Sequence, residues 1–285
     1  MIIVTGATGK LGRAIVDGLL KNISPDKIGV SVRDPEKADD LQKLGVRVRK
    51  GDFGDSKSLR DAFEGASQVL IVSSNSAGAS AVELHRNAIE AAKASGAQRI
   101  LYTSHMGSNP NSLFAPMRDH AATEELLKTS GVAFTSLRNG FYAESGLMLL
   151  GDAFQTGTVV APEDGPVSWT THADLADATV IALTTEGRLD GLTPPLTAME
   201  ALDLDKIAEV ASKLAGREIK RVTVTDEEYR ASMIAHGVPE MRVDLTMGLF
   251  AASRRGEFAA VDPTLESLLG RPAISMEDFL GFFHS

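Results

Sequence analysis

The chain has 285 residues, a formal net charge of −9 and no cysteine, which excludes disulfides, thiolate metal sites and a cysteine nucleophile. The acidic balance argues against nucleic acid or an anionic membrane as a partner. No apolar run approaches the roughly 20 residues that a membrane helix needs. The sequence opens directly on an apolar strand pattern with no signal peptide before it, so we expect a cytoplasmic protein.

Short apolar runs alternate with helical patterns through the first 140 residues. We expect strands at 2–5, 28–33, 46–48, 69–72, 100–102 and 133–137. Several of these strands are continuously apolar, as strands buried on both faces are, and helices separate them. Ser56 is expected to cap the helix after the third strand. The alternation predicts an α/β fold with a Rossmann-type, doubly wound parallel sheet.

The second half of the chain has a different pattern. We expect helices at 173–186, 204–214, 226–236 and 239–254, with one lone short strand at 222–224. The sequence therefore predicts a dinucleotide-binding domain at residues 1–140. A smaller, mostly helical substrate-binding region follows at 141–285. The helix at 173–186 is expected to return to the first domain.

A glycine-rich turn follows the first predicted strand and opens the first helix. Its spacing is G-x-x-G-x-x-G, from Gly6 to Gly12. Glycine allows the backbone to approach a pyrophosphate closely, and a helix start offers unpaired N–H groups and a positive dipole end. We predict that this turn binds a dinucleotide through Gly6, Thr8, Gly9, Lys10, Leu11 and Gly12.

The end of the second strand indicates which dinucleotide is bound. An NAD site places an acidic residue there, whereas this strand ends on Arg33. A guanidinium suits a 2′-phosphate, so we predict NADP(H), with Lys37 adding to the phosphate site. Polar and aromatic residues at later strand ends extend the predicted cofactor path: Asp52, Phe53, Ser73, Ser74, Asn75, Thr103, Ser104 and Asn139.

The catalytic pair of most short-chain reductases, Tyr-x-x-x-Lys, is absent. The residues four positions after the three tyrosines are Met106, Gly146 and Met233. Reduction of a simple ketone, which forms a very basic alkoxide, therefore loses support. Hydride transfer to a quinone forms a phenolate whose conjugate acid has a pKa of about 10, and water can protonate it. A cationic dye needs no proton at all.

Four segments together resemble the NmrA-like family of atypical short-chain reductases. They are the opening glycine-rich turn, Val32-Arg33, the Gly-Asp-Phe-Gly-Asp run at 51–55 and the Leu-Arg-Asn-Gly-Phe-Tyr block at 137–142. The most similar subgroup comprises NADPH:quinone oxidoreductases of type 2 and triphenylmethane dye reductases. Isoflavone reductases, which are more distant relatives, carry a catalytic lysine at the position of His120.

The resemblance implies an NADPH-dependent oxidoreductase that transfers hydride to a quinone-like or other aromatic small molecule. We name His120, Tyr142 and His105 as candidate catalytic residues: His105 and Tyr142 directly follow strands five and six, and the resemblance places His120 at the position of the lysine. No metal site is expected, because no ligand spacing is present. Two alternatives stay open: reduction of another acceptor such as a triphenylmethane dye, and an NADP(H)-binding redox sensor without turnover. A homodimer also stays open.

Overall fold

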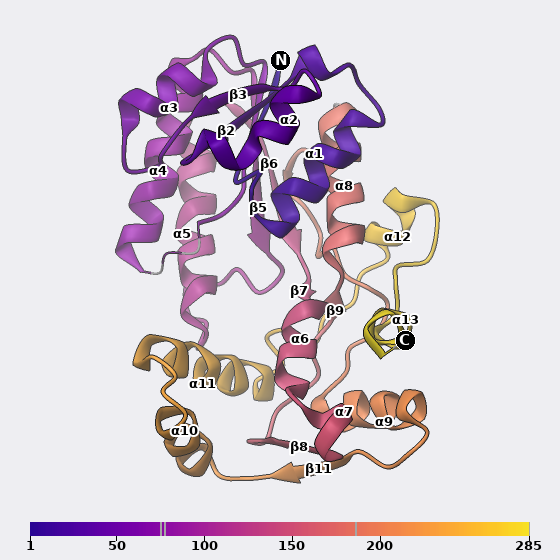
Figure 1. The fold of residues 1–285 in the computed structure, drawn as a ribbon. Coiled ribbons are helices and arrows are strands. Elements are labelled where there is room, and N and C mark those ends of the chain that lie inside the picture. Colours follow the sequence, from indigo (N-terminus) through magenta and orange to yellow (C-terminus); the bar gives the residue numbers. More distant parts are fainter. Residues whose placement is uncertain (75, 77, 186, 285) are drawn as a thin grey trace.

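The computed structural model describes residues 1–74, 76, 78–185 and 187–284. A seven-stranded parallel sheet forms its centre, with helices on both faces (Figure 1). The predicted α/β class with a doubly wound sheet is confirmed. The strands, in spatial order, are β10 (Gly191–Leu192), β6 (Ala133–Asn139), β5 (Arg99–His105), β4 (Gln68–Ile71), β1 (Ile2–Thr5), β2 (Ile28–Val32) and β3 (Arg47–Lys50).

Two layers of helices cover the sheet. In Figure 1, α1 and α8 lie together on one face, and α3, α4 and α5 lie on the other. These helices are α1 (Lys10–Leu20), α3 (Ser56–Phe63), α4 (Ala79–Ala94), α5 (Ala115–Thr129) and α8 (His172–Thr184). A 3-10 turn at Pro35–Ala38 and the short α2 (Asp39–Lys43) connect β2 to β3.

Each central strand supplies apolar side chains to both layers, which explains the continuous apolar runs. In β1, Val4 belongs to the core beneath α1 and α8, and Ile3 belongs to the core beneath α3, α4 and α5. Leu101 and Tyr102 divide in the same way in β5. The sheet is therefore held by burial on both sides, as a parallel sheet requires.

Most of the remaining elements gather at the carboxyl end of the sheet around a third core that includes Phe141, Trp169 and Phe250. The strands here are β7 (Phe141–Tyr142), β8 (Thr158–Ala161), β9 (Trp169–Thr170) and β11 (Lys220–Thr223). The helices here are α6 (Ala143–Leu150), α7 (Ala153–Thr156), α9 (Leu204–Ala215), α10 (Asp226–Ala235), α11 (Glu240–Arg254) and α13 (Met276–His284). The remaining helix, α12 (Thr264–Leu269), packs on α8 and joins the core beneath α1 and α8.

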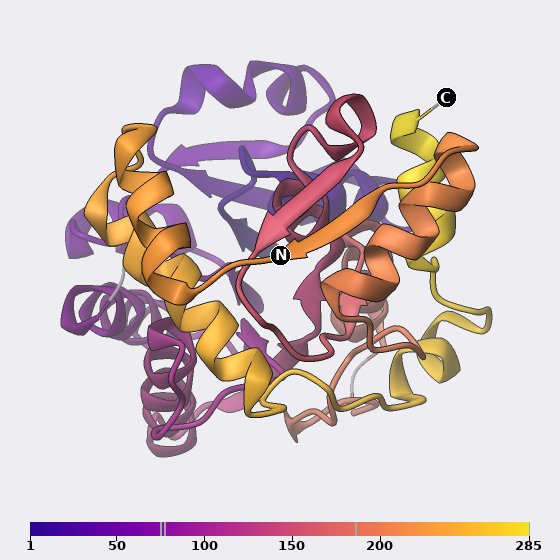
Figure 2. The same cartoon turned by 90° about the horizontal axis from the view of Figure 1, so that it is seen from below.

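Two local predictions are wrong. The strand near residue 222 is not alone: β11 pairs in parallel with β8, a strand that the sequence did not indicate (Figure 2). The cap of α3 is Asp55 rather than Ser56, because the Asp55 carboxylate accepts hydrogen bonds from the N–H groups of Lys57 and Ser58. A carboxylate at this position also complements the positive end of the helix dipole.

Candidate functional site

The chain turns sharply between β1 and α1. Gly6 has a φ of +65°, which favours glycine, and its carbonyl oxygen accepts a hydrogen bond from the Gly9 N–H at 2.9 Å. A Cβ at Gly12 would lie 2.7 Å from the Gly6 carbonyl carbon, closer than side chains pack. Gly9 is the N-cap residue of α1 and makes no side-chain cap, so the helix start can receive an anionic group.

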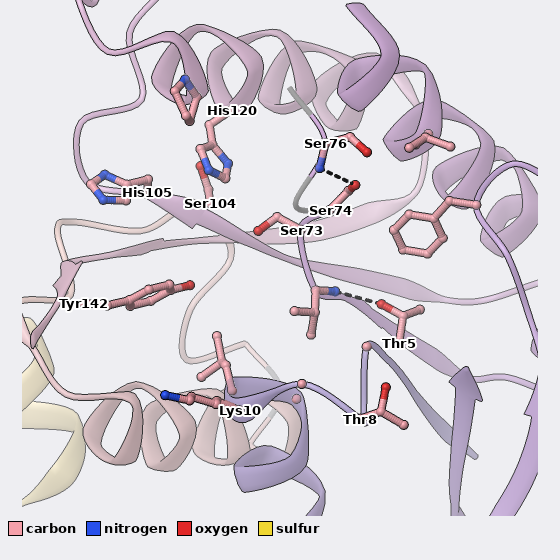
Figure 3. A pocket seen from close by; sticks show the side chains of 18 of the residues that line it. Thr5, Thr8, Lys10, Ser73, Ser74, Ser76, Ser104, His105, His120 and Tyr142 are labelled. Carbon is pink, nitrogen blue, oxygen red and sulfur yellow. Dashed lines mark hydrogen bonds between the residues drawn. The ribbon is translucent and has the colours of Figure 1, made fainter. Parts of the chain in front are cut away.

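A pocket of about 940 Å³ opens in front of this turn (Figure 3). It follows the carboxyl ends of β1 to β5, the edge at which open parallel sheets bind ligands. The structure brings most of the predicted site residues to its wall: Gly6, Thr8, Gly9, Lys10, Leu11, Gly12, Arg33, Asp52, Phe53, Ser73, Ser74, Ser104, His105, His120 and Tyr142.

Three predicted residues do not line the pocket, and Asn75 lies outside the described residues. Lys37 is exposed and contacts Asp34, with 3.7 Å between the ammonium and the carboxylate. Thr103 is buried, and its hydroxyl oxygen accepts a hydrogen bond from the Ser73 N–H at 2.8 Å. Asn139 is fully buried, and its backbone carbonyl oxygen accepts a hydrogen bond from the Met106 N–H. Thr103 and Asn139 therefore support the wall from behind.

The groups near β1 and β2 fit a dinucleotide with a 2′-phosphate. Arg33 is exposed directly after β2 and makes no ion pair within the described part of the chain. Ser31 also lines the pocket, and its hydroxyl is buried without a hydrogen-bond partner among the described residues. A buried hydroxyl without a hydrogen-bond partner costs free energy. A ligand atom that forms a hydrogen bond with it would remove this cost and so strengthen ligand binding. Lys10 reaches along the floor of the pocket (Figure 3).

The other end of the pocket is aromatic. The ring of His105 meets Phe141 edge-to-face at 5.0 Å between centroids, and Phe141 meets Phe258 at 5.1 Å. Phe114 packs on Phe141 at 5.8 Å. His120 and Tyr142 reach the same space from α5 and β7, with the Tyr142 hydroxyl directed toward its middle (Figure 3). A planar apolar acceptor matches such a wall.

Three titratable side chains at this end, His105, His120 and Tyr142, are held uncharged at neutral pH. Burial lowers the pKa of His120 to about 4, and it holds the pKa of His105 well below its usual value. Burial also raises the pKa of Tyr142 to about 12. Both imidazoles are therefore neutral hydrogen-bond donors rather than acids, and the tyrosine keeps its proton.

Several pocket residues escaped the sequence analysis. His172, which begins α8, packs against Tyr142 with 4.2 Å between ring centroids, and its Nδ1 lies 2.7 Å from a carboxylate oxygen of Glu144. Burial acts to raise the pKa of Glu144, but the contact with His172 holds it below its usual range. Leu245 reaches the pocket from α11. No residue spacing marks these positions, because tertiary packing alone brings them here.

The buried histidines predict a fall in stability below pH 6.5. Burial lowers the pKa of His85 to about 3 and that of His120 to about 4. Below pH 6.5 these histidines therefore bind protons in the unfolded chain but stay neutral in the folded chain. The loss is on the order of 1 kcal/mol per pH unit for each histidine. We expect the Tm to fall steadily from pH 6.5 to 5. His85→Gln should flatten this dependence, and an unchanged slope would contradict the assignment.

Neither a metal centre nor a membrane span is found in the described part of the chain. No group of three or more His, Asp or Glu side chains there is arranged to hold a metal ion. None of its helices is long and apolar enough to cross a membrane.

Comparison with known proteins agrees with this site. Residues 6–186 match a family described as NAD(P)H-binding. The chain is 32% identical to Quinone oxidoreductase 2 of Escherichia coli over 98% of its own length and 96% of the relative's. It is 30% identical to the NAD(P)H azoreductase of Xenophilus azovorans over 98% of its own length and 96% of the relative's.

Solved structures agree as well. The NADPH complex of the E. coli NADPH-dependent quinone oxidoreductase superposes over the full length of both chains with a TM-score of 0.93 and 30% identity. The NADP(H) complex of the Citrobacter sp. triphenylmethane reductase has a TM-score of 0.91 and 30% identity, over 99% of this chain and 100% of that one. The resemblance to NmrA-like reductases is confirmed, and the chain belongs to the NAD(P)H-binding family.

Proposed function

We propose that this protein is an NADPH-dependent reductase that transfers a hydride to a quinone-like acceptor. The observation that carries the proposal is one continuous pocket. It joins the glycine-rich turn and Arg33 at one end to aromatic rings and neutral histidines at the other. The likeness to Quinone oxidoreductase 2 over nearly the whole of both chains supports the same activity.

The residues present suggest how the cofactor is held. The turn from Gly6 to Gly12 would hold the pyrophosphate at the start of α1. Arg33 would bind the 2′-phosphate, and Ser73 and Ser74, which also line the pocket, would contact the central part of the dinucleotide. When bound, the reduced nicotinamide supplies the hydride.

The acceptor end suits a quinone for two reasons. A quinone that gains a hydride and one proton becomes a hydroquinone, and the intermediate phenolate is only weakly basic, so water supplies the proton. His105 and His120 would stabilise the growing negative charge on oxygen as neutral N–H donors. This arrangement requires no Tyr-x-x-x-Lys pair.

The test is NADPH oxidation, followed by absorbance with and without p-benzoquinone. We expect oxidation that depends on the quinone and is faster with NADPH than with NADH. A triphenylmethane dye serves as a second acceptor, and a faster rate with the dye would reassign the acceptor. Tight NADPH binding without oxidation of any acceptor would contradict the proposal and indicate a dinucleotide sensor.

A further inference from the structure

Two buried side chains behind the pocket form a chain of hydrogen bonds that ends at His120. Tyr102 is fully buried in β5, and His85 is 2% exposed in α4. The hydroxyl oxygen of Tyr102 lies 2.7 Å from Nδ1 of His120 and 3.5 Å from Nδ1 of His85. Neither side chain lines the pocket. Burying polar groups is costly unless their hydrogen bonds are satisfied, so the direction of each bond is constrained.

A hydrogen bond from the backbone fixes the tautomer of His85. The backbone N–H of Ser74, in the pocket wall, donates to Nε2 of His85 at 2.9 Å. A backbone amide can only donate, so Nε2 must be the acceptor. Burial lowers the pKa of His85 to about 3, which keeps the ring neutral. The single ring proton of His85 is therefore on Nδ1.

The tautomer of His85 in turn determines which atom accepts the proton of Tyr102. Nδ1 of His85 lies 3.0 Å from the Thr123 hydroxyl oxygen, and Thr123 donates its own proton to the carbonyl oxygen of Asp119 at 2.8 Å. Thr123 and Tyr102 thus both face the Nδ1–H of His85. Because Nδ1 of His85 already carries a proton, it cannot accept from Tyr102, so the Tyr102 proton is directed to Nδ1 of His120, 2.7 Å away.

We propose that Tyr102 and His85 are positioning residues that hold His120 as the tautomer protonated on Nε2. The ring then presents an N–H donor to the oxygen of the acceptor in the pocket. The proposal rests on the proposed reductase function, since only an acceptor with an oxygen uses that donor. A fixed donor is valuable because it needs no reorganisation while charge develops.

The neighbouring histidine follows the same pattern by a different route. The backbone N–H of Gly107 donates to Nδ1 of His105 at 3.1 Å, so the proton of neutral His105 is on Nε2. The rings of His105 and His120 are stacked, with 6.2 Å between centroids. Two adjacent imidazoles therefore expose the same kind of donor at one end of the pocket.

The direct test is nitrogen NMR of protein labelled with ¹⁵N in its histidine rings, without cofactor or acceptor, at pH 7.5. We expect His120 and His105 to be protonated on Nε2 and His85 on Nδ1, with signals assigned by single His→Gln variants. Protonation of His120 on Nδ1, or on both nitrogens, would overturn the proposal. If the tautomers are as expected but no quinone is reduced, the proposed function fails and the positioning role stands.

A kinetic test separates positioning from packing. Tyr102→Phe keeps the buried ring and removes only the hydroxyl. We expect kcat with p-benzoquinone to fall about tenfold, the lower end of the losses seen when a residue that orients a functional side chain by a hydrogen bond is removed. The KM for NADPH should stay unchanged. The matched background is His120→Gln, whose amide has no tautomer to fix. There, Tyr102→Phe should leave kcat nearly unchanged. Equal losses in both backgrounds would show a structural role and overturn the proposal.

Discussion

Replacing Gly12 with alanine is expected to raise the Kd for NADPH about a hundredfold. The new Cβ would lie 2.7 Å from the carbonyl carbon of Gly6, so the turn must move away from the position that receives the pyrophosphate. Overpacking costs roughly 1–3 kcal/mol, and each 1.4 kcal/mol is a factor of ten in affinity. The upper end applies because the new atom meets rigid backbone rather than a flexible side chain.

The single tryptophan makes this measurement practical. Trp169 contacts Phe141, which lines the pocket, with 5.5 Å between ring centroids, so its fluorescence can follow NADPH binding. Gly281→Ala is the matched control, because Gly281 lies in α13 and a Cβ there meets nothing closer than 4.0 Å. An unchanged Kd in Gly12→Ala, at unchanged Tm, would mean that the turn has only a structural role.

Arg33→Ala is expected to weaken NADPH binding by about ten- to a hundredfold while NADH binding changes little. Arg33 is exposed at the end of β2 and lines the pocket, and a guanidinium contacts a 2′-phosphate through charge-assisted hydrogen bonds. Such bonds contribute roughly 1.5–3 kcal/mol. NADH has no 2′-phosphate, so it loses none of this energy.

Lys37→Ala provides the control for Arg33→Ala. Lys37 carries the same charge and follows Arg33 by four residues, but it contacts Asp34 and does not line the pocket. We expect its removal to change the Kd for NADPH by less than about threefold, since exposed charges contribute little. Equal weakening of NADPH and NADH in Arg33→Ala would contradict the assignment of the 2′-phosphate.

The parts of the fold that could be predicted are those set by local requirements. Strands buried on both faces must be apolar throughout, and Leu101 and Tyr102 in β5 show this by belonging to opposite layers. The glycine-rich turn is equally local, because the close approach of Gly6 and Gly12 excludes side chains whatever surrounds them. The end of the pocket at the glycine-rich turn could therefore be predicted from the sequence.

The rest depends on tertiary packing. His172 begins a helix about 30 residues beyond Tyr142, and only the fold brings the two rings into contact. Leu245 enters the pocket from α11, a helix whose sequence carries no binding motif. Lys37 does not line the pocket, and its ammonium contacts Asp34 on the surface instead. The cap of α3 was ambiguous in the sequence because Asp55 and Ser56 are adjacent and both have a side-chain oxygen that can cap a helix. In the structure Asp55 is the cap.

The proposed function depends on direct hydride transfer from NADPH to a quinone. The most direct measurement is an anaerobic single turnover of flavin-free protein with p-benzoquinone, using NADPH that carries deuterium at C4 of the nicotinamide. We predict one hydroquinone formed for each NADPH consumed, and a slower reaction when deuterium occupies the transferred position. NADPH that stays bound and unoxidised, or is consumed without hydroquinone being formed, would contradict the account.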